Sequence, residues 1–166
     1  MAADASELNL SVAPLYPVDN YEDVFVDLYK RITKRDIARL CWRTDMPPQT
    51  LRAFLNFMDN RKAVFIVFDN HECAGLFWIE DIISGVQCEF SGWIPFAYRG
   101  LDSELIMRYS LDFVHEKIHI PCIRCQTPWP SGRSICLRAG MTLEHVLSPY
   151  STGAKMGKLW IFKDLR

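Results

Sequence analysis

The sequence predicts an α+β fold in which a mixed, mostly antiparallel sheet is flanked by helices. Apolar residues recur at helical spacing in the first third of the chain, and from Lys62 onward the spacing changes to that of strands. The length of 166 residues suits one ordinary domain and leaves little room for two. We therefore expect a single domain over residues 1–166, with residues 1–7 flexible.

Helices are expected between residues 20 and 60. Asn20 is a favourable N-cap, and the apolar residues after it follow helical spacing. Thr33 and Asp36 resemble a capping box and begin a second helix, and Pro47 and Pro48 end that helix and open a third. Residues 23–32 also fit the period of a strand in part, so both helix and strand remain open for that segment.

The rest of the chain alternates between strands and helices. Residues 63–69 and 73–83 read as two strands of an antiparallel hairpin joined by a polar turn, and residues 86–94 read as a third strand. A long helix is expected after Gly100. The elements expected after it are a strand at 120–126, a short helix at 131–139 and two strands near 142–147 and 158–162.

Composition and charge restrict the class of protein. Hydrophobic residues make up 49% of the chain and charged residues 23%, which are values of a globular protein. The N-terminal residues do not resemble a secretory signal, and no apolar run approaches the ~20 residues of a membrane helix, so we expect a cytoplasmic protein without a membrane partner. The net charge of −1 argues against nucleic-acid binding, and the six cysteines are expected to be reduced thiols.

Two short motifs suggest a family. Pro95 precedes Tyr98-Arg99-Gly100 at a junction between strand and helix, and Leu137-Arg138-Ala139-Gly140-Met141 lies at a later junction between helix and strand. With the order of elements, these motifs resemble the GCN5-related N-acetyltransferase (GNAT) superfamily over roughly residues 8–164. The resemblance implies transfer of an acetyl or other acyl group from acyl-CoA to an amine acceptor, either a small molecule or a protein. It leaves the oligomeric state open, with a homodimer as one option.

The resemblance also implies a cofactor site, with one marked departure. Its implied acyl-CoA residues are Trp93, Ile94, Phe96, Arg99, Gly100, Leu101 and Ser103. The family loop usually reads Arg/Gln-x-x-Gly-x-Gly/Ala, and counting from Arg99 puts Asp102 and Glu104 at the two small positions. Two like charges ~4 Å apart repel by ~4 kcal/mol at an effective dielectric near 20, whereas the helix dipole stabilises a carboxylate at the helix start by only ~0.3–1 kcal/mol. Alternatively, Asp102 is the N-cap and Glu104 lies in an acidic first turn, so that side chains of the helix itself pair with the free N–H groups at its start.

Catalytic groups are implied at two positions. Glu89 is at the place of the family's general base, and Cys136 is at the place of its tyrosine acid, four residues before Gly140. Each has a structural alternative, because Glu89 also fits an outward strand position and Cys136 also fits core packing. The hydroxyl of Tyr150 is a further candidate for the acid.

Histidines and cysteines also cluster at residues 115–125. His115, His119, Cys122 and Cys125 have a compact spacing that could suit zinc. We expect no metal there, because a separation of three residues points the two cysteines to opposite faces of one strand.

Five aromatic residues lie on or near the expected strands. They are expected mainly to pack in the core and on the sheet, and they are Trp78, Phe90, Trp93, Phe96 and Trp129. In the resembled fold, Trp93 and Phe96 would line the cleft between two splayed strands.

Two functions of different classes therefore remain open. One is an N-acyltransferase, and the other is a catalytically silent GNAT-like binding or assembly protein, phage-type assembly factors included. Asp102 and Glu104 favour the second, whereas the retained Pro95, Arg99, Gly100 and Gly140 favour the first.

Overall fold

A seven-stranded sheet forms the centre of the molecule. The computed structural model describes residues 8–15, 22–40, 48, 50–59, 63–152 and 155–166. Within them the strand order is β1-β2-β3-β4-β5-β7-β6, and every neighbouring pair is antiparallel except β4 and β5. The mixed, mostly antiparallel sheet confirms the predicted fold class. The expectation of a flexible segment at residues 1–7 lies outside the described part.

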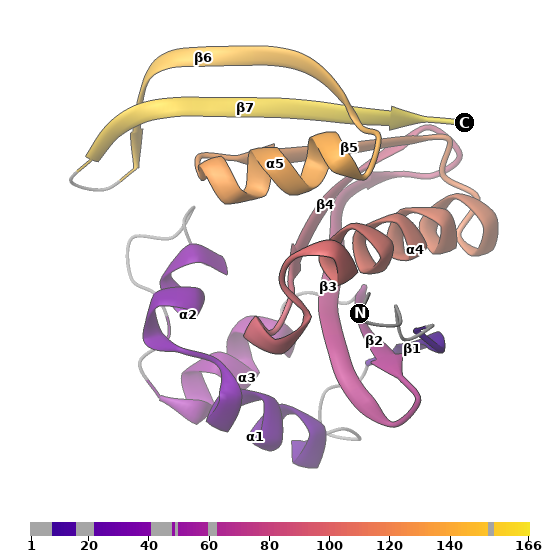
Figure 1. Cartoon of the computed structure of the whole chain (residues 1–166), viewed down its shortest axis with the longest axis vertical. Coiled ribbons are helices and arrows are strands. Elements are labelled where there is room, and N and C mark those ends of the chain that lie inside the picture. Colours follow the sequence, from indigo (N-terminus) through magenta and orange to yellow (C-terminus); the bar gives the residue numbers. More distant parts are fainter. Residues whose placement is uncertain (1–7, 16–21, 41–47, 49, 60–62, 153–154) are drawn as a thin grey trace, which may run out of the picture.

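Three helices cover one face of the sheet (Figure 1). They are α1 (Glu22–Arg31), α2 (Lys34–Leu40) and α3 (Leu51–Asp59), so residues 22–31 form a helix and not a strand. The backbone N–H of Asp36 donates to Thr33 Oγ1 at 3.1 Å, as the capping-box pattern predicts. The third helix starts differently from the prediction, because Thr50 Oγ1 accepts from the N–H of Ala53 and provides the cap in place of the prolines.

The first strand was not predicted from the sequence. β1 (Leu10–Pro14) pairs antiparallel with β2 and forms one edge of the sheet. Its side chains are only partly buried, and it contains a proline, which is tolerated on an edge strand. A short edge strand of this kind has little of the apolar alternation by which strands are recognised.

The remaining elements follow the predicted order. The antiparallel strands β2 (Val64–Asp69), β3 (Glu72–Ile83) and β4 (Gln87–Trp93) lead through the 3-10 turn η2 (Phe96–Tyr98) into α4 (Leu101–Lys117). β5 (Cys122–Thr127) then runs parallel to β4. The chain ends with α5 (Pro130–Arg138), β6 (Thr142–Thr152) and β7 (Lys155–Leu165). These last two strands are longer than predicted.

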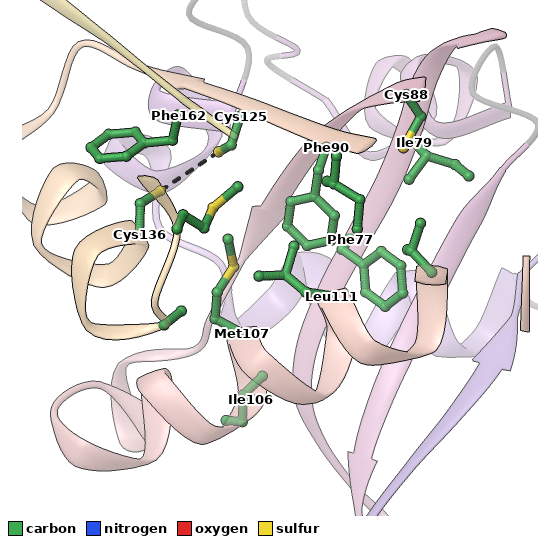
Figure 2. Packing of buried hydrophobic residues seen from close by; sticks show 14 of the residues in the cluster. Phe77, Ile79, Cys88, Phe90, Ile106, Met107, Leu111, Cys125, Cys136 and Phe162 are labelled. Carbon is green, nitrogen blue, oxygen red and sulfur yellow. Dashed lines mark hydrogen bonds between the residues drawn. The ribbon is translucent and has the colours of Figure 1, made fainter. Parts of the chain in front are cut away.

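Side chains of β4 alternate between two apolar cores. Cys88 and Phe90 pack toward α4 and α5, whereas Trp93 belongs to the core beneath α1–α3. In the first core the rings of Phe77 and Phe90 stack with centroids 5.2 Å apart, and Leu111 of α4 is fully buried in the same cluster (Figure 2). No helix in the described part of the chain is both long enough and apolar enough to cross a membrane.

Candidate functional site between β4 and β5

A cleft opens where the two parallel strands separate. Their pairing runs from Gln87 and Cys122 to Phe90 and Cys125 and ends there, although β4 continues to Trp93 and β5 to Thr127. A cavity of about 230 Å³ lies at this point, lined on the strand side by residues 90–94 and 125–127. Backbone groups of β4 beyond Phe90 therefore face the cleft instead of a neighbouring strand.

The cleft has an ionic wall and an apolar wall. α2 contributes Asp36 and Arg39, and the loop before α4 contributes Arg99. α4 contributes Ile106 and Met107 to the opposite side, which is therefore largely apolar. Residues 131, 132, 135 and 136 of α5 complete the lining.

A half-buried ion pair joins α2 to the loop before α4. Arg99 Nη2 donates to Asp36 Oδ1 at 2.9 Å, and Arg99 Nε donates to the carbonyl of Ile94 at 3.1 Å. Burial raises the pKa of Asp36, but hydrogen bonds from Arg99 and Thr33 and the charge of Arg99 outweigh burial, so this pKa lies below its ordinary value of 3.8. The indole N–H of Trp93 also lowers this pKa, from a position outside the geometry of an ordinary hydrogen bond.

Asp36→Asn should lower the free energy of unfolding at neutral pH. It should also make that free energy less dependent on pH in the acid range. Because the folded-state pKa of Asp36 is lowered, its contribution is present above pH 3.8 and is lost as the pH falls through the lowered pKa. We expect the variant to lose about 1 kcal/mol of unfolding free energy at pH 7 and to match wild type more closely in acid. Urea unfolding over about pH 2.5–7 measures this difference.

The matched control removes an exposed carboxylate from its ion pairs. Glu144 contacts Arg124 of β5 and Lys163 of β7, and Glu144→Gln should have a smaller effect than Asp36→Asn. Equal acid sensitivity of Asp36→Asn and wild type would show that the ion pair does not stabilise the fold.

The start of α4 differs from the sequence prediction in its cap. Gly100, not Asp102, is the N-cap, and its φ of 110° is a conformation that favours glycine. Asp102 and Glu104 both lie within the first helical turn, and neither side chain caps the helix among the described residues. The buried hydroxyl of Ser103 donates to the carbonyl of Gly100 at 2.6 Å. The helix start therefore keeps N–H groups without a side-chain cap, in the presence of two carboxylates.

The structure brings four of the proposed site residues to the cleft. The four that line it are Trp93, Ile94, Arg99 and Cys136. Glu89 is half-buried on the same face of β4 as Trp93 and is not part of the lining. Gly100 and Ser103 lie beside the cleft at the start of α4. The side chains of Leu101 and Tyr150 are outside the described part of the chain.

The aromatic residues divide between packing and cleft. Phe96 is 82% exposed and does not line the cleft, so the expectations that it would pack and would line the cleft were both wrong. Its position in the short turn η2, beyond the end of β4, explains this exposure. The other four aromatic residues all contribute to the lining, and they are Trp78, Phe90, Trp93 and Trp129.

Two charged cleft residues were not recognised as site residues from the sequence. Arg39 lies with its guanidinium carbon 5.6 Å from the ring centroid of Trp129, and Asp36 binds Arg99. Asp36 was interpreted only as a capping residue. The one signal for a second role was its helical spacing of three from Arg39, which places both residues on one side of α2.

His115 and Cys125 have separate partners outside the group His115, His119, Cys122 and Cys125. His115 Nδ1 donates to the carbonyl of Ile120 at 2.7 Å, and its Nε2 lies 3.2 Å from Asp164 Oδ2. Cys122 is half-buried, whereas Cys125 points to the other face of β5, toward Cys136. The described residues contain no group of three or more side chains placed to hold a metal ion.

Comparisons with known proteins identify the fold. A GNAT-family acetyltransferase from Bacillus anthracis has a TM-score of 0.74 at 11% identity, with 94% of each chain covered. Spermidine N-acetyltransferase from Vibrio cholerae, solved with CoA and spermine, has a TM-score of 0.73 at 15% identity, covering 94% of this chain and 95% of that chain. Ribosomal-protein-S5-alanine acetyltransferase from Vibrio fischeri has a TM-score of 0.70 at 10% identity, with coverage of 94% and 92%. No family model and no curated protein matches the sequence. The chain therefore has the fold of the GNAT N-acetyltransferases.

Proposed function

We propose that this protein is an N-acyltransferase that uses acetyl-CoA or another acyl-CoA and an amine acceptor, either a small molecule or a protein. The observation that carries the proposal is the cleft of about 230 Å³ at the point where β4 and β5 stop pairing. A separated strand offers backbone donors and acceptors that an extended, amide-containing cofactor can bind. The solved relative with bound CoA supports a coenzyme of this type.

The residues near the cleft fit such a coenzyme in part. Trp93 and Ile94 would hold its arm along β4, the exposed ring of Phe96 would contact it outside the cleft, and the start of α4 would receive the diphosphate. Gly100, Leu101 and Ser103 form that start, and Arg99 adds a positive charge beside it. The coenzyme supplies the activated thioester. The misfit is the pair of carboxylates at Asp102 and Glu104, which should weaken binding.

Two side chains are proposed for proton transfer. Glu89 would take a proton from the incoming ammonium, and Cys136 would return one to the leaving thiolate. The position of Cys136 in the cleft lining supports its role. Glu89 directly precedes residues 90–94, which line the cleft, and it lies on the same face of β4 as Trp93. It would therefore act from beside the cleft.

Removing the two carboxylates should strengthen coenzyme binding. We expect Asp102→Asn/Glu104→Gln to lower the Kd of acetyl-CoA about tenfold, because partial solvent exposure screens a repulsion that is ~4 kcal/mol at close range. Isothermal titration of wild type and variant with acetyl-CoA and CoA measures the difference.

The control variant changes the net charge of the same helix by the same amount. Asp112→Asn/Glu116→Gln lies at the far end of α4, where both residues contact Arg166, and it should leave the Kd within about twofold. Absence of binding by both wild type and the Asp102/Glu104 variant would contradict the proposed function.

A silent protein of the same fold is the second candidate. It is favoured by the acidic first turn of α4 and by the engagement of Arg99 with Asp36. The same titration separates the two functions: binding gained only by Asp102→Asn/Glu104→Gln supports a lost coenzyme site. Binding by wild type, followed by acetyl transfer to an amine, supports the enzyme.

A further inference from the structure

Two thiols meet in the wall of the cleft. The S–H of Cys136 on α5 points to Sγ of Cys125 on β5, with the two sulfur atoms 3.7 Å apart (Figure 2). Both residues line the cavity, and their exposed fractions are 9% for Cys125 and 3% for Cys136. The sulfur atoms are thus shielded from bulk solvent but adjacent to a space that a small molecule can enter.

The sulfur separation is suitable for a covalent link. A disulfide bond is about 2.05 Å long, so the two atoms need to approach by roughly 1.7 Å. The two residues belong to different elements joined by the turn at 128–129, and side-chain rotation with a small shift of α5 can supply this approach. A thiol oxidised first would find its partner already in contact.

The other described cysteines are less suited to this reaction. Burial raises the pKa of Cys73 to about 11 and that of Cys88 to about 12, which makes each a weaker nucleophile than an ordinary exposed thiol at neutral pH. The Cys73 thiol also donates to the carbonyl of Gly75. Cys122 is on the opposite face of β5 from Cys125 and cannot replace it in the pair.

We propose that Cys125 and Cys136 form a peroxide-sensitive modification site in the cleft. One thiolate attacks hydrogen peroxide, giving a sulfenic acid and water after proton uptake. The second thiol displaces the sulfenic oxygen as a further water, and the sulfur–sulfur bond forms. In total, two thiols and one peroxide give one disulfide and two waters.

The cleft is large enough to admit the oxidant. A volume of about 230 Å³ holds several molecules of the size of water, which occupies about 30 Å³ in the liquid, and peroxide is only slightly larger. The resulting disulfide removes the S–H of Cys136, a consequence for catalysis that rests on the proposed function.

Peptide mapping of the whole protein tests the site without reference to activity. The protein is treated with hydrogen peroxide, denatured, alkylated and cleaved with trypsin without reduction. Cleavage after Arg124, Arg133 and Arg138 places Cys125 in peptide 125–133, Cys136 in peptide 134–138 and Cys122 in a separate peptide. We expect these first two peptides to appear linked, with loss of two hydrogens and of two alkylation sites, and to separate on reduction.

The controls identify the partners. Cys122→Ser should link as wild type does, whereas Cys125→Ser should give no linked peptide. Unlinked, alkylated Cys125 and Cys136 in peroxide-treated wild type would overturn the proposal, as would a Cys88–Cys122 link as the main product. The linkage measured in wild-type protein tests the proposal even if a variant fails to fold.

Added acetyl-CoA separates this site from the proposed function. If the coenzyme occupies the cleft, it should slow the linkage by covering the lining. Linkage that proceeds at an unchanged rate would contradict the coenzyme position and leave the modification site supported.

Discussion

Replacement of Asp164 by alanine is expected to lower the free energy of unfolding by about 3 kcal/mol, because it removes the buried carboxylate that His115 and Arg108 both contact. Asp164 is 8% exposed, and its Oδ2 lies 3.2 Å from His115 Nε2 and 3.6 Å from Arg108 Nη1. Both partners belong to α4, whereas Asp164 belongs to β7. The carboxylate therefore attaches the long helix to a strand distant from it in the sequence.

The same network reaches the end of α5. Arg108 donates to the carbonyl of Ala139, and the next residue is Gly140, with a φ of 83°. A Cβ at Gly140 would overlap the Arg108 guanidinium, so the glycine leaves space for this contact and also adopts a positive φ that would strain a residue with a side chain. Loss of Asp164 should loosen Arg108 and with it the junction between α5 and β6.

Chemical denaturation of Asp164→Ala, with Asp112→Ala as control, measures the effect. Asp112 also pairs with an arginine, Arg166, but its side chain is 34% exposed and that of Arg166 is 37% exposed. The control should therefore change the unfolding free energy by no more than about 1 kcal/mol. Equal losses in the two variants would show that burial of the Asp164 pair adds nothing to stability.

Helices and strands with strong periodicity could be predicted from the sequence. The buried strands near Val64 and Phe77 and the helix after Gly100 have apolar patterns set by the cores into which they pack. β1 could not be predicted, because its pairing with β2 is a contact between residues about sixty positions apart, such as Leu10 and Asp69. The local spacing of apolar residues does not indicate such a pairing for a short, half-buried edge strand.

The candidate site was predictable to a smaller extent. Trp93 and Cys136 were placed near the cleft through the order of elements, and both line it. Asp36 could not be placed there, because its contact with Arg99 joins residues 63 positions apart through the packing of α2. The position predicted for Phe96 was wrong because β4 ends at Trp93 and the chain then turns into η2, which exposes the ring.

Gly132→Ala should destabilise the fold by about 2 kcal/mol through overpacking of α5 against β5. A Cβ at this position would lie 3.0 Å from Cβ of Thr127 and 3.2 Å from its Cγ2, and still closer to its hydroxyl oxygen. An ordinary glycine-to-alanine change in a helix is favourable by up to about 1 kcal/mol, so a loss would be a specific sign of this contact. Thermal or urea unfolding measures it.

The control is Gly157→Ala, since a Cβ at Gly157 meets nothing within 4 Å; it should alter stability by less than about 0.5 kcal/mol.

The double variant with Thr127→Ala tests whether the clash is the cause. Thr127→Ala removes the hydroxyl and the Cγ2 that crowd position 132, at the expense of the hydrogen bond that Thr127 Oγ1 accepts from the N–H of Trp129. The combined loss should therefore be smaller than the sum of the single losses by about 1 kcal/mol or more. Additive losses would contradict a direct contact. Because Thr127 and Gly132 both line the cleft, a shift of α5 in Gly132→Ala should also weaken acetyl-CoA binding, and relief of the clash in the double variant should restore that binding together with stability.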